Sequence, residues 1–168
     1  MVSISPVADP QARAWQVLET VPDPEIPVLS VVDLGIVRYV HARAADTTVG
    51  LAPTYTGCPA VEVIEATVRE ALQRELGKPV TIDRVLSPPW TTDWITDAGR
   101  RKLTDYGIAP PAEAATSVRQ LFDKGLGVAC PRCNSTSTTR VSEFGSTPCK
   151  AAYKCDDCLE PFDYFKCI

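Results

Sequence analysis

Residues 130 to 158 read CPRCNSTSTTRVSEFGSTPCKAAYKCDDC, and the two Cys-x2-Cys pairs in this segment decide the fold of the C-terminal part of the chain. Cys130 and Cys133 form the first pair, Cys155 and Cys158 form the second, and 21 residues separate them. A two-residue gap lets both thiolates of a tight turn reach one ion, and a second such turn completes a tetrahedron. The spacing predicts a structural zinc site with no open coordination position.

The residues around the two pairs favour strands. STTRVSEFG, KAAYK and EPFDYFK are rich in Thr, Val, Tyr and Phe, which suit a small sheet that holds the two turns together. The segment 128–168 has too few apolar residues to fold unaided, so metal binding would supply its folding energy. We therefore expect a small all-β zinc-ribbon domain here. Unligated core cysteines are the alternative, which the agreement with zinc-site spacings disfavours.

Two further cysteines leave the ligand set open. Cys149 and Cys167 lie close enough in sequence for a different set of four, with Cys149 as the extra candidate, or for an iron–sulfur cluster. Zinc is favoured because the tight Cys-x2-Cys-x2-Cys run of many ferredoxins is missing. After the second pair stands Leu159, where a glycine often relieves a left-handed turn, whereas Asn134 after the first pair tolerates that conformation better.

The chain before the ribbon has a mixed pattern of helices and strands. The first expected elements are a helix over DPQARAWQVLETV, a stiff loop over PDPEIPVLSVVDLG, and a hairpin of GIVRYVHARA and TTVGLAPTYT. They are followed by a helix from Pro59 to Gly77, a strand PVTIDRVL, and a helix from about Asp93 that Gly99 breaks or weakens. This order predicts an α+β fold, a small open α/β sandwich of one sheet with helices against one face.

The domain boundaries follow from composition. We expect the sandwich domain over residues 1–107, a linker over residues 108–127 that begins with the Pro- and Ala-rich APPAEAATS, and the ribbon over residues 128–168. VRQLFDKGLG, within the linker, could form a short helix.

Charge and hydropathy exclude several classes of protein. The net charge is −4 and no stretch is strongly basic, which argues against a nucleic-acid partner. No apolar run reaches the 18 or more residues of a membrane span, and MVSISPVADP lacks the features of a signal peptide. We expect a cytoplasmic protein, and in that reducing compartment clustered cysteines bind metal more readily than they form disulfides.

A seventh cysteine lies far from the others, in TYTGCPAVEV. If Pro59 is the first helical residue, Cys58 is the N-cap, where the helix dipole favours the thiolate. Such a thiol could ligate a soft metal or attack an electrophile. Thr54 and Thr56 make its approach polar, and the proline-rich loop supplies Asp23 and Glu25 as acidic companions. The alternative is a small buried cap without chemistry.

Ordinary catalytic patterns are missing from the sequence. The single histidine, His41, stands in the charged strand end YVHARA, so Cys–His catalysis is disfavoured and a nucleophilic Cys58 would lack an identifiable general base. No Ser-His-Asp set, phosphate-binding glycine loop or dinucleotide fingerprint is present. The Glu-x-x-His pairs that hold di-iron centres in helical bundles are also missing, so the chain is not expected to be a catalytic oxygenase component.

Two motifs together carry a resemblance to a known family. DPEIPVLSVVDLGIV followed by PTYTGCPAVEVI resembles, over about residues 10–105, the small domain shared by the bacterial SufT protein and eukaryotic cytosolic iron–sulfur assembly factors. With the tail CPRC…STPCKAAYKCDDCLEPFDYFKCI added, the whole chain resembles the PaaD family of small subunits encoded with phenylacetyl-CoA epoxidase systems.

The resemblance implies an accessory role in aerobic phenylacetate breakdown, in which a di-iron oxygenase and a ferredoxin-type reductase would be the partners. It places the reactive cysteine of the family at Cys58 and its acidic loop at Glu25, with Asp23 beside it, and it matches the four ribbon ligands. A transient iron or iron–sulfur cluster would then accompany the structural zinc. A structural or regulatory subunit is the competing interpretation, and homodimerisation is left open.

Overall fold

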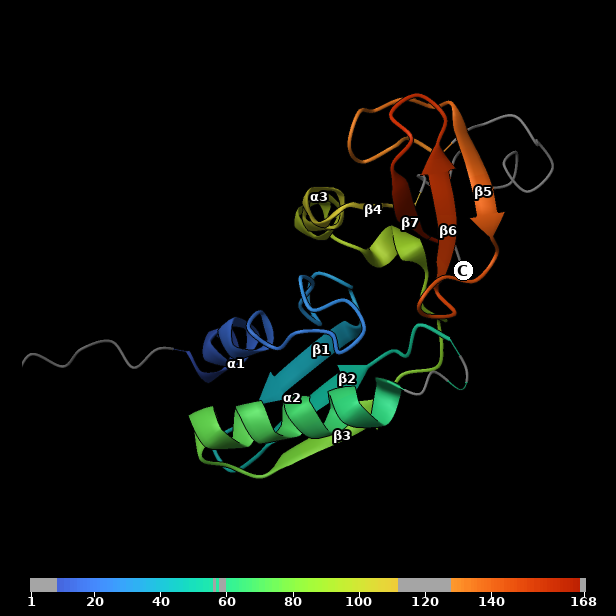
Figure 1. Cartoon of the computed structure of the whole chain (residues 1–168). Coiled ribbons are helices and arrows are strands. Elements are labelled where there is room, and N and C mark those ends of the chain that lie inside the picture. The colour runs from blue at the N-terminus through green and yellow to red at the C-terminus, as the bar shows by residue number, and fades with distance from the viewer. Residues whose placement is uncertain (1–8, 56, 58–59, 112–127, 167–168) are drawn as a thin grey trace, which may run out of the picture. The chain divides into compact units, whose positions relative to one another are not determined.

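A computed structural model describes residues 9–55, 57, 60–111 and 128–166, and Figure 1 shows its ribbon. The chain divides into two compact units, Met1–Trp90 and Thr91–Ile168. Helices and two small sheets together confirm the predicted α+β class. None of the helices within the described ranges is long and apolar enough to cross a membrane.

In the part that the structure describes, the first unit is a three-stranded sheet with two helices. Its elements are α1 (Pro10–Leu18), β1 (Val37–Ala42), β2 (Thr47–Leu51), α2 (Ala60–Leu76) and β3 (Val80–Arg84). β2 lies in the middle, antiparallel to β1 and parallel to β3. α1 packs on α2 and β1, and α2 packs on β3, so both helices cover the same face of the sheet. This is the predicted open sandwich.

Local sequence signals place the two helices. The Asp9 carboxylate accepts a hydrogen bond from the Gln11 amide (3.1 Å), and Pro10 occupies the first turn of α1, as a helix N-terminus favours. Apolar residues at helical spacing bury one side of α2 against the sheet, namely Ile64, Val68, Ala71 and Leu72. Gly77 ends α2 with a left-handed φ of 64°, a conformation that glycine adopts without strain.

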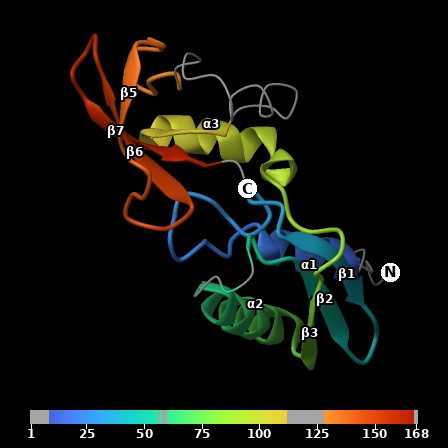
Figure 2. The same ribbon diagram turned by 90° about the vertical axis from the view of Figure 1, so that its right-hand side faces the viewer.

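Within its described residues, the second unit holds a four-stranded sheet, one α-helix and one short 3-10 helix. Its elements are η1 (Thr92–Trp94), α3 (Asp97–Tyr106), β4 (Ile108–Ala109), β5 (Thr138–Ser142), β6 (Lys150–Cys155) and β7 (Pro161–Phe165). Figure 2 shows this sheet and α3 from a second direction. The strand order is β4-β7-β6-β5. β5, β6 and β7 form an antiparallel meander, whereas β4 joins β7 in parallel. The predicted small sheet around the cysteine pairs is therefore present.

The division of the chain differs from the expected linker over residues 108–127. β4 lies inside that range, yet it pairs with β7, and both β4 and α3 belong to the second unit. α3 begins at Asp97, later than the expected start near Asp93, because the Thr96 hydroxyl caps it by accepting from the Gly99 amide (3.0 Å), and the helix continues through Gly99. The expected helix over residues 118–127 lies outside the described residues.

Candidate functional site

The two Cys-x2-Cys pairs fold into two turns of the same construction. In the first, the Cys130 amide donates to the Ser135 carbonyl (2.9 Å), and in the second the Cys155 amide donates to the Glu160 carbonyl (3.0 Å), five residues on in each case. The residue after each pair has a left-handed backbone, with φ of 61° at Asn134 and 65° at Leu159. We call these two turns, Cys130–Cys133 and Cys155–Cys158, the knuckles.

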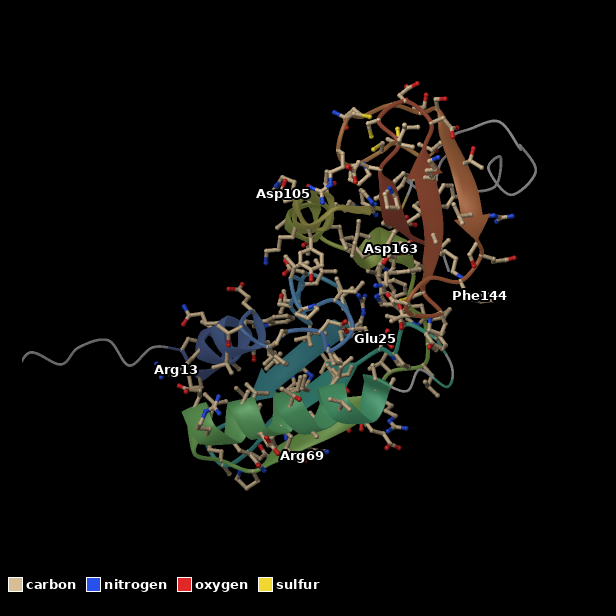
Figure 3. All side chains as sticks on the ribbon, viewed as in Figure 1. Arg13, Glu25, Arg69, Asp105, Phe144 and Asp163 are labelled. Carbon is tan, nitrogen blue, oxygen red and sulfur yellow. The ribbon has the colours of Figure 1, made fainter. Side chains whose placement is uncertain are left out.

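The knuckles bring four sulfur atoms together at one end of the second unit (Figure 3). All four Sγ atoms lie within 4.8 Å of one another, with 3.8 Å between Cys130 and Cys158 and 3.6 Å between Cys133 and Cys155. Zinc–thiolate bonds of about 2.3 Å in a tetrahedron place the sulfur atoms about 3.8 Å apart. The four cysteines therefore form a metal-binding group whose size fits one tetrahedral zinc ion.

Backbone amides donate hydrogen bonds to the sulfur of the first cysteine in each knuckle. The Arg132 amide donates to the Cys130 sulfur (3.4 Å), and the Cys158 amide donates to the Cys155 sulfur (3.5 Å). The latter bond lowers the pKa of the Cys155 thiol to about 7. The Glu160 amide lowers the pKa of Cys158, but loss of hydration and the neighbouring sulfurs outweigh it and raise this pKa to about 12. An entering cation must therefore displace protons.

Two of the four cysteines are buried in the second unit and two lie at its surface. Cys130 and Cys155 are fully buried and pack with Ala109 and Phe162, whereas Cys133 and Cys158 reach the surface. Four thiolates already complete a tetrahedral shell, so a bound zinc ion would have no position left for a substrate. The arrangement suits a structural ion.

Cys149 lies apart from this group. Cys149 precedes β6, whereas Cys155 is the last residue of that strand. The buried Cys149 sulfur lies 3.0 Å from the Thr147 hydroxyl oxygen. Among the described residues, only Cys130, Cys133, Cys155 and Cys158 lie close enough to share one ion. The geometry gives no support to Cys149 as an additional ligand, and Cys167 lies outside the described residues.

Leu159 carries a backbone cost that a substitution should remove. Its left-handed φ costs a non-glycine residue about 1–2 kcal/mol, and its side chain, which is 64% exposed, offers little packing in return. Glycine adopts this conformation freely but has a more flexible unfolded state, so Leu159→Gly should raise the free energy of unfolding by about 0.5–1 kcal/mol. Denaturant unfolding of the metal-loaded protein measures this. Asn134→Gly is the control and should change the free energy of unfolding less. If Leu159→Gly destabilises the protein, the leucine side chain makes stabilising contacts.

The predicted acidic residues of the first unit have different environments. Asp23 is buried, and its Oδ1 accepts hydrogen bonds from the amides of Glu25 (2.9 Å) and Ile26 (2.7 Å). Glu25 is half-buried on the same loop. The Asp23 carboxylate thus fixes the turn that carries Glu25, a role that the sequence interpretation of Asp23 as an acidic companion did not include.

Sequence reasoning missed a second carboxylate in this loop. The buried Asp33 accepts hydrogen bonds from the Ser30 amide and the Ser30 hydroxyl, both at 2.9 Å, and its own amide donates to the same hydroxyl oxygen (3.0 Å). This reciprocal Ser-x-x-Asp pattern resembles the capping box of helix N-termini. The spacing of Ser30 and Asp33 was the signal that could have identified the pair.

The predicted thiol site is described only around its margins. Thr54 is half-buried, and Gly57 is exposed with φ of 90° and open space where a Cβ atom would lie. The first described residue of α2 is Ala60, two positions after Cys58. Thr56 and Cys58 lie outside the described residues, so their grouping with Thr54, Asp23 and Glu25 stays a prediction.

The two units match two different protein families. Residues 11–83 match the model of the iron-sulfur cluster assembly protein family, and residues 114–166 match that of the PaaD zinc beta ribbon domain. The structure is similar to the crystal structure of a domain of unknown function, DUF59, from Bacillus anthracis, with 25% sequence identity and a TM-score of 0.53. The match covers 56% of this chain and 91% of the Bacillus anthracis chain.

Two further proteins are similar in sequence. A Porphyromonas gingivalis "Fe-S protein maturation auxiliary factor" is 37% identical over 52% of this chain and 85% of its own. An Escherichia coli (strain K12) protein, named as a subunit of a "Putative 1,2-phenylacetyl-CoA epoxidase", is 47% identical over 100% of both chains. This full-length identity, with an assembly-type domain followed by a PaaD zinc ribbon, shows that the chain belongs to the PaaD family of phenylacetyl-CoA epoxidase subunits.

Proposed function

We propose that this chain is a cytoplasmic accessory subunit of a phenylacetyl-CoA epoxidase system that helps to assemble an iron–sulfur or di-iron centre in its partners. The observation that carries the proposal is the 47% identity to an epoxidase subunit over the whole of both chains. The similarity of the first unit to an iron–sulfur protein maturation factor supports the assembly role. The partners would be the oxygenase and reductase subunits, and the chain itself would catalyse no reaction.

In this proposal the two units have separate roles. The four ribbon cysteines would hold zinc, which stabilises the fold of the second unit and leaves no open position for iron. Cys58 would bind iron or a cluster transiently as a thiolate and release it to ligands of the client. Gly57, which precedes Cys58 in the sequence, has open space at its Cβ position, and Asp23 orders the turn that carries Glu25. The iron is cargo here, not a resident cofactor.

Replacement of Cys58 tests this role. Cys58→Ala should fold normally, because the loss of one cap residue costs about 1 kcal/mol. Cells that co-express it with the oxygenase and reductase subunits should nevertheless contain partners with low iron content and little epoxidase activity. Iron analysis of the purified partners, together with their activity, is the measurement.

Val63→Ala is a matched control, since Val63 is 53% exposed on α2 and should leave both readouts unchanged. Fully iron-loaded and active partners from the Cys58→Ala cells would refute the transfer role. If cells that lack the chain contain iron-loaded but inactive partners, the chain is instead a structural or regulatory subunit.

A further inference from the structure

Helix α3 is too short to be stable alone. It has ten residues, whereas an isolated helix of fewer than about 12–15 residues is marginal in water, and Gly99 in its first turn lowers its propensity further. Its stability must therefore come from packing within the second unit. Both family matches leave residues 84–113 uncovered, so neither of them accounts for this helix or for β4.

Side-chain hydrogen bonds join α3 to the residues on either side of it. The Arg100 guanidinium donates to the Thr92 carbonyl (2.9 Å) in η1 and to the Pro111 carbonyl (2.6 Å) beyond β4. One arginine thus ties η1, α3 and the end of β4 together. Residues 92–111 form a single structural segment, which we call the α3 segment.

β4 joins the α3 segment to the sheet that carries the metal-binding cysteines. Ile108 pairs with Asp163 and Ala109 pairs with Tyr164 of β7. Ala109 is 1% exposed and packs in the same small cluster as Cys130 and Cys155. Ala109 of β4 is therefore packed in one cluster with two of the metal-binding cysteines.

A second contact joins the first knuckle to the end of α3. Gly107 ends the helix with φ of 91°, and its amide donates to the carbonyls of Leu103 and Thr104. A Cβ atom at Gly107 would lie 3.2 Å from Nη2 of Arg132, so the guanidinium lies against the last turn. A cation is favourable there because the C-terminal end of a helix carries partial negative charge.

We infer that metal binding by the four cysteines also controls the folding of the α3 segment. The cluster around Cys130 and Cys155 is small, so the ribbon depends on the ion for its stability, and α3 and β4 depend on the ribbon. Loss of the ion unfolds residues 92–111 together with β5, β6 and β7, while the first unit stays folded. This inference does not rest on the role proposed for Cys58.

Hydrogen exchange of the full-length protein tests this coupling. Amides of α3 and β4 should lose protection to the level of an unstructured chain when a zinc chelator and a thiol reductant remove the ion, at the same time as those of β5 to β7. Amides of α2 and β2 should keep their protection, and added zinc should restore that of α3. Persistent protection of α3 in the metal-free protein, or simultaneous loss of protection in α2, would overturn the inference.

Arg132→Ala tests the contact without removal of the ion. The variant should retain about one ion per chain, because all four cysteines remain, but α3 should exchange faster than in the wild type. Arg101→Ala is the control, since Arg101 is exposed on the same helix. Equal protection of α3 in Arg132→Ala and wild type would show that the knuckle does not hold the helix, and would count against the coupling.

Discussion

The Cys133→Ser protein should lose its bound ion and, with it, the folded second unit. Cys133 is exposed, so the change removes a thiolate without leaving a cavity in the core, and any large effect must arise from the metal site. Structural zinc sites contribute on the order of 10 kcal/mol to folding, and a site with three thiolates should retain only a fraction of that. Metal content after dialysis should fall from about one ion per chain to nearly none, while the first unit still unfolds cooperatively.

Cys149→Ser is the matched control for this experiment. Cys149 does not belong to the group of four sulfurs, so this variant should keep its ion. A full complement of metal in Cys133→Ser would show that the assigned site is wrong. Loss of metal from Cys149→Ser would instead make Cys149 a ligand, and the double variant with Cys167→Ser then shows whether both thiols take part.

Asp23→Ala should destabilise the first unit by about 2–4 kcal/mol, because two backbone amides near the buried carboxylate lose their acceptor. An amide that stays unpaired in a buried turn costs about 1–3 kcal/mol, and the turn that carries Glu25 would lose its fixed geometry. Denaturant unfolding of the first-unit transition measures the change, with the metal-stabilised transition as an internal reference.

Asp23→Asn separates the hydrogen bonds of Asp23 from its charge. The asparagine side chain keeps an acceptor oxygen in the position of Oδ1, so most of the stability should return. If Asp23→Asn is stable but fails to support epoxidase maturation in cells, the negative charge has a role in the proposed function. If Asp23→Ala is as stable as the wild type, the hydrogen bonds to Glu25 and Ile26 are not what orders the loop.

The elements with clear periodicity could be predicted from the sequence. The buried stripe of α2 and the hairpin of β1 and β2 depend on neighbouring residues, and both lie where the sequence predicts them. The two cysteine pairs, recognised by their spacing, lie close together in the structure. The placement of α3 and β4 in the second unit could not be predicted in the same way. Ile108 and Ala109 form a strand too short to show alternation, and Pro110 and Pro111 directly after them read as a linker.

The role of Asp23 within its loop could not be predicted, for a different reason. An aspartate in a proline-rich loop can cap backbone amides or face a ligand, and sequence does not distinguish the two. Only the hydrogen bonds from two backbone amides to its carboxylate show that Asp23 has the capping role. The ribbon cysteines were easier, since tetrahedral coordination imposes a spacing that can be recognised without coordinates.

The short strand β4 also determines which strand lies at one edge of the second sheet. β4 covers one side of β7, whose side chains include Phe162, Tyr164 and Phe165, and an uncovered aromatic strand is a template for intermolecular pairing and aggregation. A ribbon fragment that starts at residue 114 would lack this cover, whereas one that starts at residue 91 would keep it. We therefore expect the shorter fragment to leave the backbone of β7 at residues 163 and 164 exposed for intermolecular pairing, and the longer one to keep it covered.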